Sequence, residues 1–157
     1  MAKLLKDKIQ FKSGKFYFDI HFYSGFTLIS GDSATGKTLF FNSLRQLVIA
    51  DNMKGYLFVN HKDLVDVNPI ESVLQKIKRN TGSVILIDDG DVVLKGLQNP
   101  WELISQDMDN QYIVFGRNID YFNITSTNYA ELVEDNKQFR LDYIYKGGPC
   151  DGIKCMD

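Results

Sequence analysis

Hydrophobic positions along the chain repeat with two different periods, and each change of period marks a new element. Apolar and polar residues alternate across 9–22, so this segment predicts a β-hairpin with Gly14 in its turn. Other apolar runs are short and nearly continuous, which is typical of buried parallel strands. These runs are FTLIS (26–30), YLFVN (56–60), SVILID (83–88) and QYIVFG (111–116).

Between these runs lie segments whose apolar residues recur with the spacing of a helix. Apolar residues recur with this spacing over 40–48, directly after the first run. A second helix is predicted over 69–81, because Asn68 is a good N-cap and is followed by Pro at the first helical position. The same Asn-Pro-x-Glu arrangement starts at Asn99 and predicts a short helix through about Gln106.

The order of these elements indicates the fold class. Strands alternate with helices from residue 26 to residue 116, as in a parallel sheet with helices on both faces. Two further alternating runs flank Asp135-Asn136 and predict a closing hairpin. We therefore expect an α/β protein, a three-layer sandwich with a mostly parallel central sheet and antiparallel hairpins at both chain ends.

Composition narrows the possibilities further. The chain has 157 residues, of which 44% are hydrophobic, enough for one domain that we place at 1–147, with a flexible tail over 148–157. Both cysteines, Cys150 and Cys155, lie in that tail and are expected to stay reduced. The sequence contains no apolar run long enough for a membrane span and begins without a signal-like apolar core, so we expect a cytoplasmic protein.

Charge gives little indication of a nucleic-acid partner. The net charge is −2, which provides no overall attraction to a phosphate backbone. Five lysines nevertheless crowd the first 15 residues. We interpret them as residues that protect an exposed sheet edge, and a basic docking patch is the alternative.

The stretch GDSATGKT (31–38) joins the first buried strand to the first helix with the spacing G-x-x-x-x-G-K-[ST]. Glycines let the backbone turn its N–H groups toward phosphate oxygens, Lys37 adds a positive charge, and Thr38 offers a hydroxyl to Mg²⁺. This context predicts a phosphate-binding loop. The candidate nucleotide-binding residues are Gly31, Asp32, Ser33, Ala34, Thr35, Gly36, Lys37, Thr38 and Leu39.

With this loop, residues 8 to 145 resemble the P-loop NTPase superfamily. SVILIDDGD looks like the Walker B element of that superfamily, which implies that Asp88 holds Mg²⁺ together with Thr38. In the additional-strand branch (ABC- and AAA-type ATPases), the next acidic residue polarises the attacking water, and that place belongs to Asp89 here. The following strand in that branch ends in a sensor of the γ-phosphate, for which Arg117 or Asn118 is the candidate.

The resemblance is strongest to ABC-type ATPases at the N-terminus, where an aromatic-rich hairpin precedes the loop. An aromatic residue there often stacks on adenine, which implies Phe11, Phe16 or Tyr17. The chain departs from that family because it has no LSGGQ-like signature and no room for a helical subdomain before Asp88. It resembles a reduced P-loop core, so transport or DNA tethering is not implied.

The expected function is ATP binding with slow, Mg²⁺-dependent hydrolysis, used to change conformation or to switch a protein partner or a second copy of the chain. Asp89 is shorter than the usual Glu, so a non-hydrolysing regulatory subunit is an alternative. A small-molecule kinase is another, although no arginine-rich lid is visible and only four arginines occur. A GTPase fits less well, because GRNID does not meet the N-K-x-D pattern.

Overall fold

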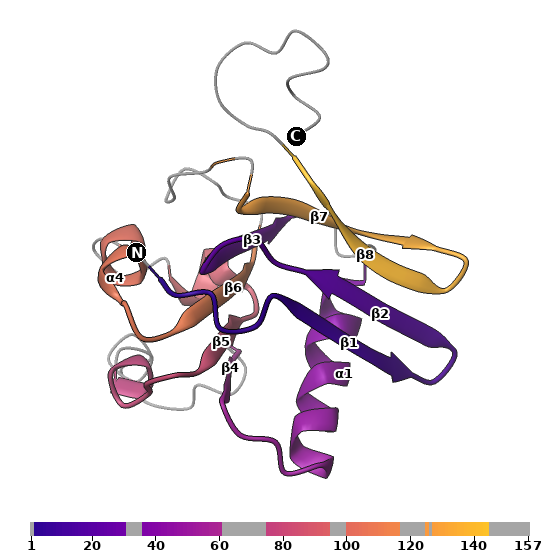
Figure 1. The fold of residues 1–157 in the computed structure, drawn as a ribbon, viewed down its shortest axis with the longest axis horizontal. Helices are drawn as coiled ribbons and strands as arrows, with labels where there is room; N and C mark the ends of the chain where they lie inside the picture. The colour runs from indigo at the N-terminus through magenta and orange to yellow at the C-terminus, as the bar shows by residue number, and fades with distance from the viewer. Residues whose placement is uncertain are drawn as a thin grey trace, which may run out of the picture.

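The chain folds around one strongly curled, mixed sheet of eight strands (Figure 1). This computed structural model describes residues 2–30, 36–60, 75–94, 100–116, 125 and 127–144. The order across the sheet is β1-β2-β8-β7-β3-β6-β5-β4. The strands are β1 (Lys8–Ser13), β2 (Phe16–His21), β3 (Phe26–Ser30), β4 (Tyr56–Val59), β5 (Val84–Ile87), β6 (Gln111–Phe115), β7 (Tyr129–Asp135) and β8 (Gln138–Tyr143).

Strand directions confirm the predicted α/β class with a mostly parallel sheet. Only β1–β2 and β7–β8 pair antiparallel, and every other neighbouring pair among the described strands is parallel. These two antiparallel hairpins come from the two ends of the sequence, yet they lie side by side, because β2 pairs with β8. They form the right-hand part of the view in Figure 1.

Helices pack on both faces of the sheet. The helices with assigned bounds are α1 (Lys37–Ala50), α3 (Gly90–Val93) and α4 (Pro100–Gln106), and residues 75–78 are helical too. Successive side chains of a strand point to opposite faces, so β5 contributes Leu86 to the core under α1 and Ile85 to the core under α4. No helix among the described residues is long and apolar enough to cross a membrane.

The core on the α1 side is built largely from phenylalanine. The ring of Phe18 stacks on Phe11 and on Phe139, each with centroids 4.7 Å apart, and Phe40 of α1 packs against the Phe18 ring. Burying a side chain of this size contributes about 1.5–3 kcal/mol. The hairpins and α1 are therefore held together by one aromatic cluster.

Two local predictions differ from the structure. The strand 56–60 was expected to be fully buried, but β4 is the edge strand and only Val59 is buried. The closing hairpin turns one residue later than expected, because Asn136 and Lys137 both have positive φ, as in the two-residue turns that fit the twist of a hairpin. The other edge of the sheet is β1, where the exposed Lys8 and Lys12 lie, in agreement with the edge-protection interpretation.

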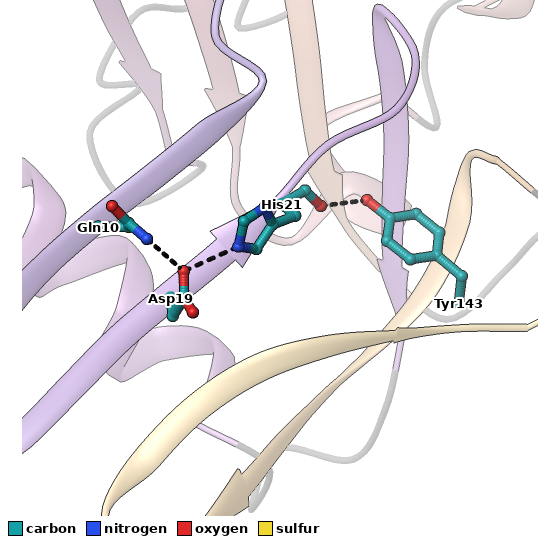
Figure 2. Close-up of polar contacts among 4 residues, drawn as sticks. All are labelled: Gln10, Asp19, His21 and Tyr143. Carbon is teal, nitrogen blue, oxygen red and sulfur yellow. Dashed lines mark hydrogen bonds and ion pairs between the residues drawn. The ribbon is translucent and has the colours of Figure 1, made fainter.

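A polar network joins the strands on the exposed face of the hairpins (Figure 2). Gln10 Nε2 donates to Asp19 Oδ1 at 2.7 Å, and His21 Nε2 lies 2.9 Å from the same oxygen. The Gln10 hydrogen bond and the nearby charges of His21 and Lys8 lower the pKa of Asp19 despite some desolvation. The hydroxyl of Tyr143 donates to the carbonyl of His21, so this network links β1, β2 and β8.

A second polar network lies where β6 begins. The hydroxyl of Tyr112 donates to Asp107 Oδ2 at 2.6 Å, and Asn110 Nδ2 donates to the same oxygen at 2.9 Å. Burial and the Asp107 carboxylate raise the pKa of Tyr112. Desolvation opposes ionisation of Asp107, but the hydrogen bonds from Tyr112, Asn110 and the backbone outweigh it and lower its pKa. We therefore interpret Asp107 as a structural acid.

The buried Gln111 clamps the N-terminal segment to the sheet. Its Oε1 accepts hydrogen bonds from the backbone N–H groups of Leu5 (2.9 Å) and Lys6 (2.7 Å), and its Nε2 donates to the Lys6 carbonyl (3.0 Å). A Cβ on Gly25 would lie 2.0 Å from the carbonyl oxygen of Ala2, so only glycine admits this segment beside β3. No pattern in the sequence predicts this clamp.

We predict that Gln111→Leu destabilises the fold. The substitution leaves the backbone groups of residues 5 and 6 without their side-chain partner, so the free energy of unfolding should fall by about 2–4 kcal/mol. Urea unfolding followed by circular dichroism measures this change. Gln138→Leu, at an exposed position on β8, is the control and should stay within about 0.5 kcal/mol of the wild type. Equal stability of the two variants would contradict the clamp.

Candidate functional site

A cleft of about 290 Å³ lies where α1 begins and where β5 and β6 end. Parallel strands bring their carboxyl ends to one edge of a sheet, so residues that follow different strands gather there. Ile87, the residue before Asp88, pairs in register with Val114, and the next residue of that strand, Phe115, pairs with Ile29 of the strand before the loop. The lining residues are Lys37, Thr38, Asp88, Asp89, Asp91, Val92, Phe115 and Gly116.

Asp88 follows β5 directly, as predicted, and only 7% of it is exposed. Its Oδ1 accepts the backbone N–H of Asp89 at 3.0 Å, and its Oδ2 accepts Asn60 Nδ2 at 3.3 Å. Both donors hold the carboxylate in one orientation at the cleft. Asn60 follows β4, so a residue that no sequence motif singled out positions the candidate metal ligand.

The end of the predicted phosphate loop is held tightly against the hairpins. Gly36 has φ +95°, which a residue with a side chain rarely adopts, and a Cβ there would lie 2.6 Å from Cε1 of Phe139. Lys37 is the first residue of α1 and is buried, whereas Thr38 is exposed. Gly36 is therefore required both by its backbone conformation and by the aromatic ring beside it.

Asp89 occupies an unusual backbone conformation at the mouth of the cleft. Its φ and ψ are 51° and 50°, the left-handed region, where Asp and Asn are the best tolerated residues after glycine. Its carbonyl accepts the N–H groups of Val92 and Val93, so it is the N-cap residue of α3. Gly90 follows, and a Cβ there would lie 2.5 Å from Val114 Cγ1. Strained residues of this kind cluster at functional sites.

Asp91 also lines the cleft. Its carboxylate lies close to the end of β6, so that a Cβ on Gly116 would be 3.0 Å from Asp91 Oδ1. The helix α3 begins at Gly90, which places Asp91 in its first turn. Three carboxylates thus share the cleft with one lysine.

Several predicted site residues lie outside the described residues. These are Gly31, Asp32, Ser33, Ala34 and Thr35 of the loop and the sensor candidates Arg117 and Asn118. The structure thus brings together Lys37, Thr38, Asp88 and Asp89 from the predicted set. Among the residues that are described, no group of three or more His, Cys, Asp or Glu side chains is arranged to hold a metal ion by itself.

A second cavity of about 530 Å³ lies beside Gly36 and Leu39. It is bounded by the hairpin residues Phe16, Leu132, Val133, Glu134 and Phe139. Leu39, which the sequence placed at the end of the nucleotide-binding set, therefore borders this cavity and not the acidic cleft. Of the aromatic residues proposed for stacking, Phe11 is part of the core and Phe16 borders the cavity.

No protein-family model, curated protein or solved structure matches this chain.

Proposed function

We propose that this chain binds ATP with Mg²⁺ at the cleft and hydrolyses it slowly, as a reduced P-loop NTPase. One observation carries the proposal. Lys37 and Thr38, at the end of the GDSATGKT stretch, line the same cleft as Asp88. Asp88 follows β5, which lies two positions away from β3, the strand that leads into this stretch. A phosphate-binding lysine, a hydroxyl and a fixed carboxylate are the groups that a Mg²⁺-triphosphate requires.

The order of the parallel strands supports the additional-strand branch. β6 lies between β3, which leads into the loop, and β5, which ends at Asp88. An additional strand in that position is the feature after which the branch is named. The helices on both faces of this sheet agree with the expected three-layer arrangement.

The proposed chemistry assigns a separate task to each group. Lys37 neutralises charge on the β- and γ-phosphates, and Thr38 and Asp88 orient Mg²⁺ through its oxygen and water ligands. Asp89 orients the attacking water. A cation for the transition state is also needed, and of the described arginines Arg45, Arg79 and Arg140 none lines the cleft. We assign that role to Arg117 or to an arginine of a partner or second copy, with Asn118 as the alternative γ-phosphate sensor.

A non-hydrolysing regulatory subunit is the second candidate function. It is favoured by the exposed position and short side chain of Asp89. A carboxylate one methylene shorter than Glu reaches less far toward the γ-phosphate, so nucleotide would bind and remain intact. Asp91, in the same cleft, is the other residue that could orient a water.

Lys37→Ala should weaken ATP binding roughly 10- to 100-fold, because hydrogen bonds to charged groups are worth about 1.5–3 kcal/mol. Alanine is a good helix former at this first position of α1, so the fold should persist. Calorimetric titration measures the affinity, and Lys54→Ala, an exposed lysine beyond α1, is the matched control. Wild-type affinity in the Lys37 variant would overturn the phosphate site.

Asp88→Asn should reduce ATP affinity in the presence of Mg²⁺ by about tenfold and change it little in EDTA. The amide oxygen still accepts the Asp89 N–H, and the new NH2 group donates to Asn60 once that side-chain amide turns its oxygen inward, so the local structure is retained while the metal loses a charged ligand. Titrations with and without Mg²⁺ separate the two effects. Equal losses under both conditions would identify Asp88 as a structural cap.

Asp89→Asn should leave ATP bound and lower turnover at least about tenfold, because the amide cannot polarise water as a carboxylate does. Asparagine is chosen because it tolerates the left-handed conformation that alanine would strain. Phosphate release under saturating ATP is the measurement, with Asp91→Asn as the comparison. A larger loss in Asp91→Asn would transfer the role to Asp91, and a wild type that never releases phosphate would favour the regulatory subunit.

A further inference from the structure

Residues 36–39 separate two cavities of different chemistry. Lys37 and Thr38 line the acidic cleft, whereas Gly36 and Leu39 line the cavity beside the hairpins. Positions three apart at the start of a helix share one face, so Gly36 and Leu39 border the same space. A nucleotide has a charged triphosphate at one end and a flat, largely apolar base at the other. The acidic cleft with Lys37 suits a triphosphate that carries Mg²⁺, the mainly apolar second cavity suits the base, and consecutive residues at the start of α1 line both.

The cavity beside the hairpins has walls suited to a flat ring. Phe16 is half-buried, and its ring lies 5.3 Å from that of Phe139. Leu39 is 37% exposed and borders the same space. Ligand sites are mainly apolar with a few polar groups that determine specificity. Among the described lining residues, Glu134 supplies the one charged side chain.

Glu134 lies at the end of β7, where the closing hairpin turns. Its Oε2 accepts the backbone N–H of Lys137 at 3.3 Å, which orients the side chain within the turn. An ionised carboxylate has about four lone-pair sites, so this bond leaves capacity for a ligand. A carboxylate only accepts hydrogen bonds. The group of a base that it can recognise is therefore an N–H donor.

We propose that the second cavity holds the purine base of the bound nucleotide and that Glu134 selects the base by accepting a hydrogen bond from its exocyclic amino group. The proposal rests on the proposed function, because the cleft must hold the triphosphate. The donor is the 6-amino group of adenine or the 2-amino group of guanine. A purine without that group leaves Glu134 with no partner and should bind more weakly, roughly tenfold for a charge-assisted bond.

The test compares nucleotides that differ by one amino group. ATP is compared with purine riboside triphosphate, which lacks the 6-amino group, and GTP is compared with ITP, which lacks the 2-amino group. Affinities are measured with Mg²⁺ for the wild type, Glu134→Ala and Glu131→Ala. Glu131 lies on the same strand, is exposed, and is not among the described lining residues, so it controls for the loss of one negative charge.

We expect the wild type to bind ATP roughly tenfold more tightly than purine riboside triphosphate. Glu134→Ala should reduce this ratio to within about twofold, while Glu131→Ala retains it. Discrimination between GTP and ITP that disappears only in Glu134→Ala would also support the proposal and would identify guanine as the base. The proposal would be overturned if the affinity ratios were the same in Glu134→Ala and in the wild type. It would also be overturned if the wild type bound both members of each nucleotide pair equally well.

Inorganic tripolyphosphate separates this failure from a failure of the proposed function. It has no base, so Glu134→Ala should bind it at least as well as the wild type does, which also shows that the variant is folded. If tripolyphosphate and ATP bind and Lys37→Ala weakens both, the phosphate site stands whatever the outcome at Glu134. If the wild type binds neither, the proposed function fails and the base assignment fails with it.

Discussion

The parallel register between β3, β6 and β5 is the constraint on which the candidate site depends. Backbone hydrogen bonds pair Ile29 with Phe115 and Ile87 with Val114, which sets Asp88 level with the residues that lead into the loop. Two strand spacings separate β3 from β5, about 10 Å in total. This is a suitable separation for a lysine and a carboxylate to approach a triphosphate and its metal from two sides. A slip of one residue in either pairing would direct the opposite face of the strand toward α1 and move Asp88 out of the cleft.

The aromatic cluster couples that parallel core to the hairpins. Phe139 stacks on Phe18 and also lies against Gly36, where no side chain would fit. One ring of β8 therefore contacts both the hairpin core and the start of α1. The cavity that we assign to the base is bounded by the same residues, so its shape depends on the packing that positions the start of α1.

Strain at the mouth of the cleft distinguishes Asp89 from the other acids. Asp88 is buried and oriented by two donors, while Asp89 is exposed in a left-handed conformation that costs on the order of 1 kcal/mol for a residue with a side chain. A glycine would relieve that strain. The presence of Asp instead is consistent with a role for its carboxylate, and Asp91 beside Gly116 gives the cleft a second candidate for the same task.

Much of the local structure follows from the sequence alone. The period of the apolar residues, the Asn-Pro-x-Glu cap and the glycines at turns predicted both hairpins, β3, β5, β6, α1 and α4, because these signals act between neighbours in the chain. The GDSATGKT spacing likewise predicted Lys37 and Thr38 as candidate site residues, and the apolar run SVILI predicted Asp88.

Only the tertiary structure decided how these elements meet. The position of β6 between β3 and β5, the edge position of β4, the Gln111 clamp and the pairing of β2 with β8 all involve residues far apart in the sequence. The same holds for the second cavity, which joins Phe16, Leu39 and Glu134. Residues that are so far apart leave no periodic pattern in the sequence, because their contacts depend on the order in which the strands lie in the sheet.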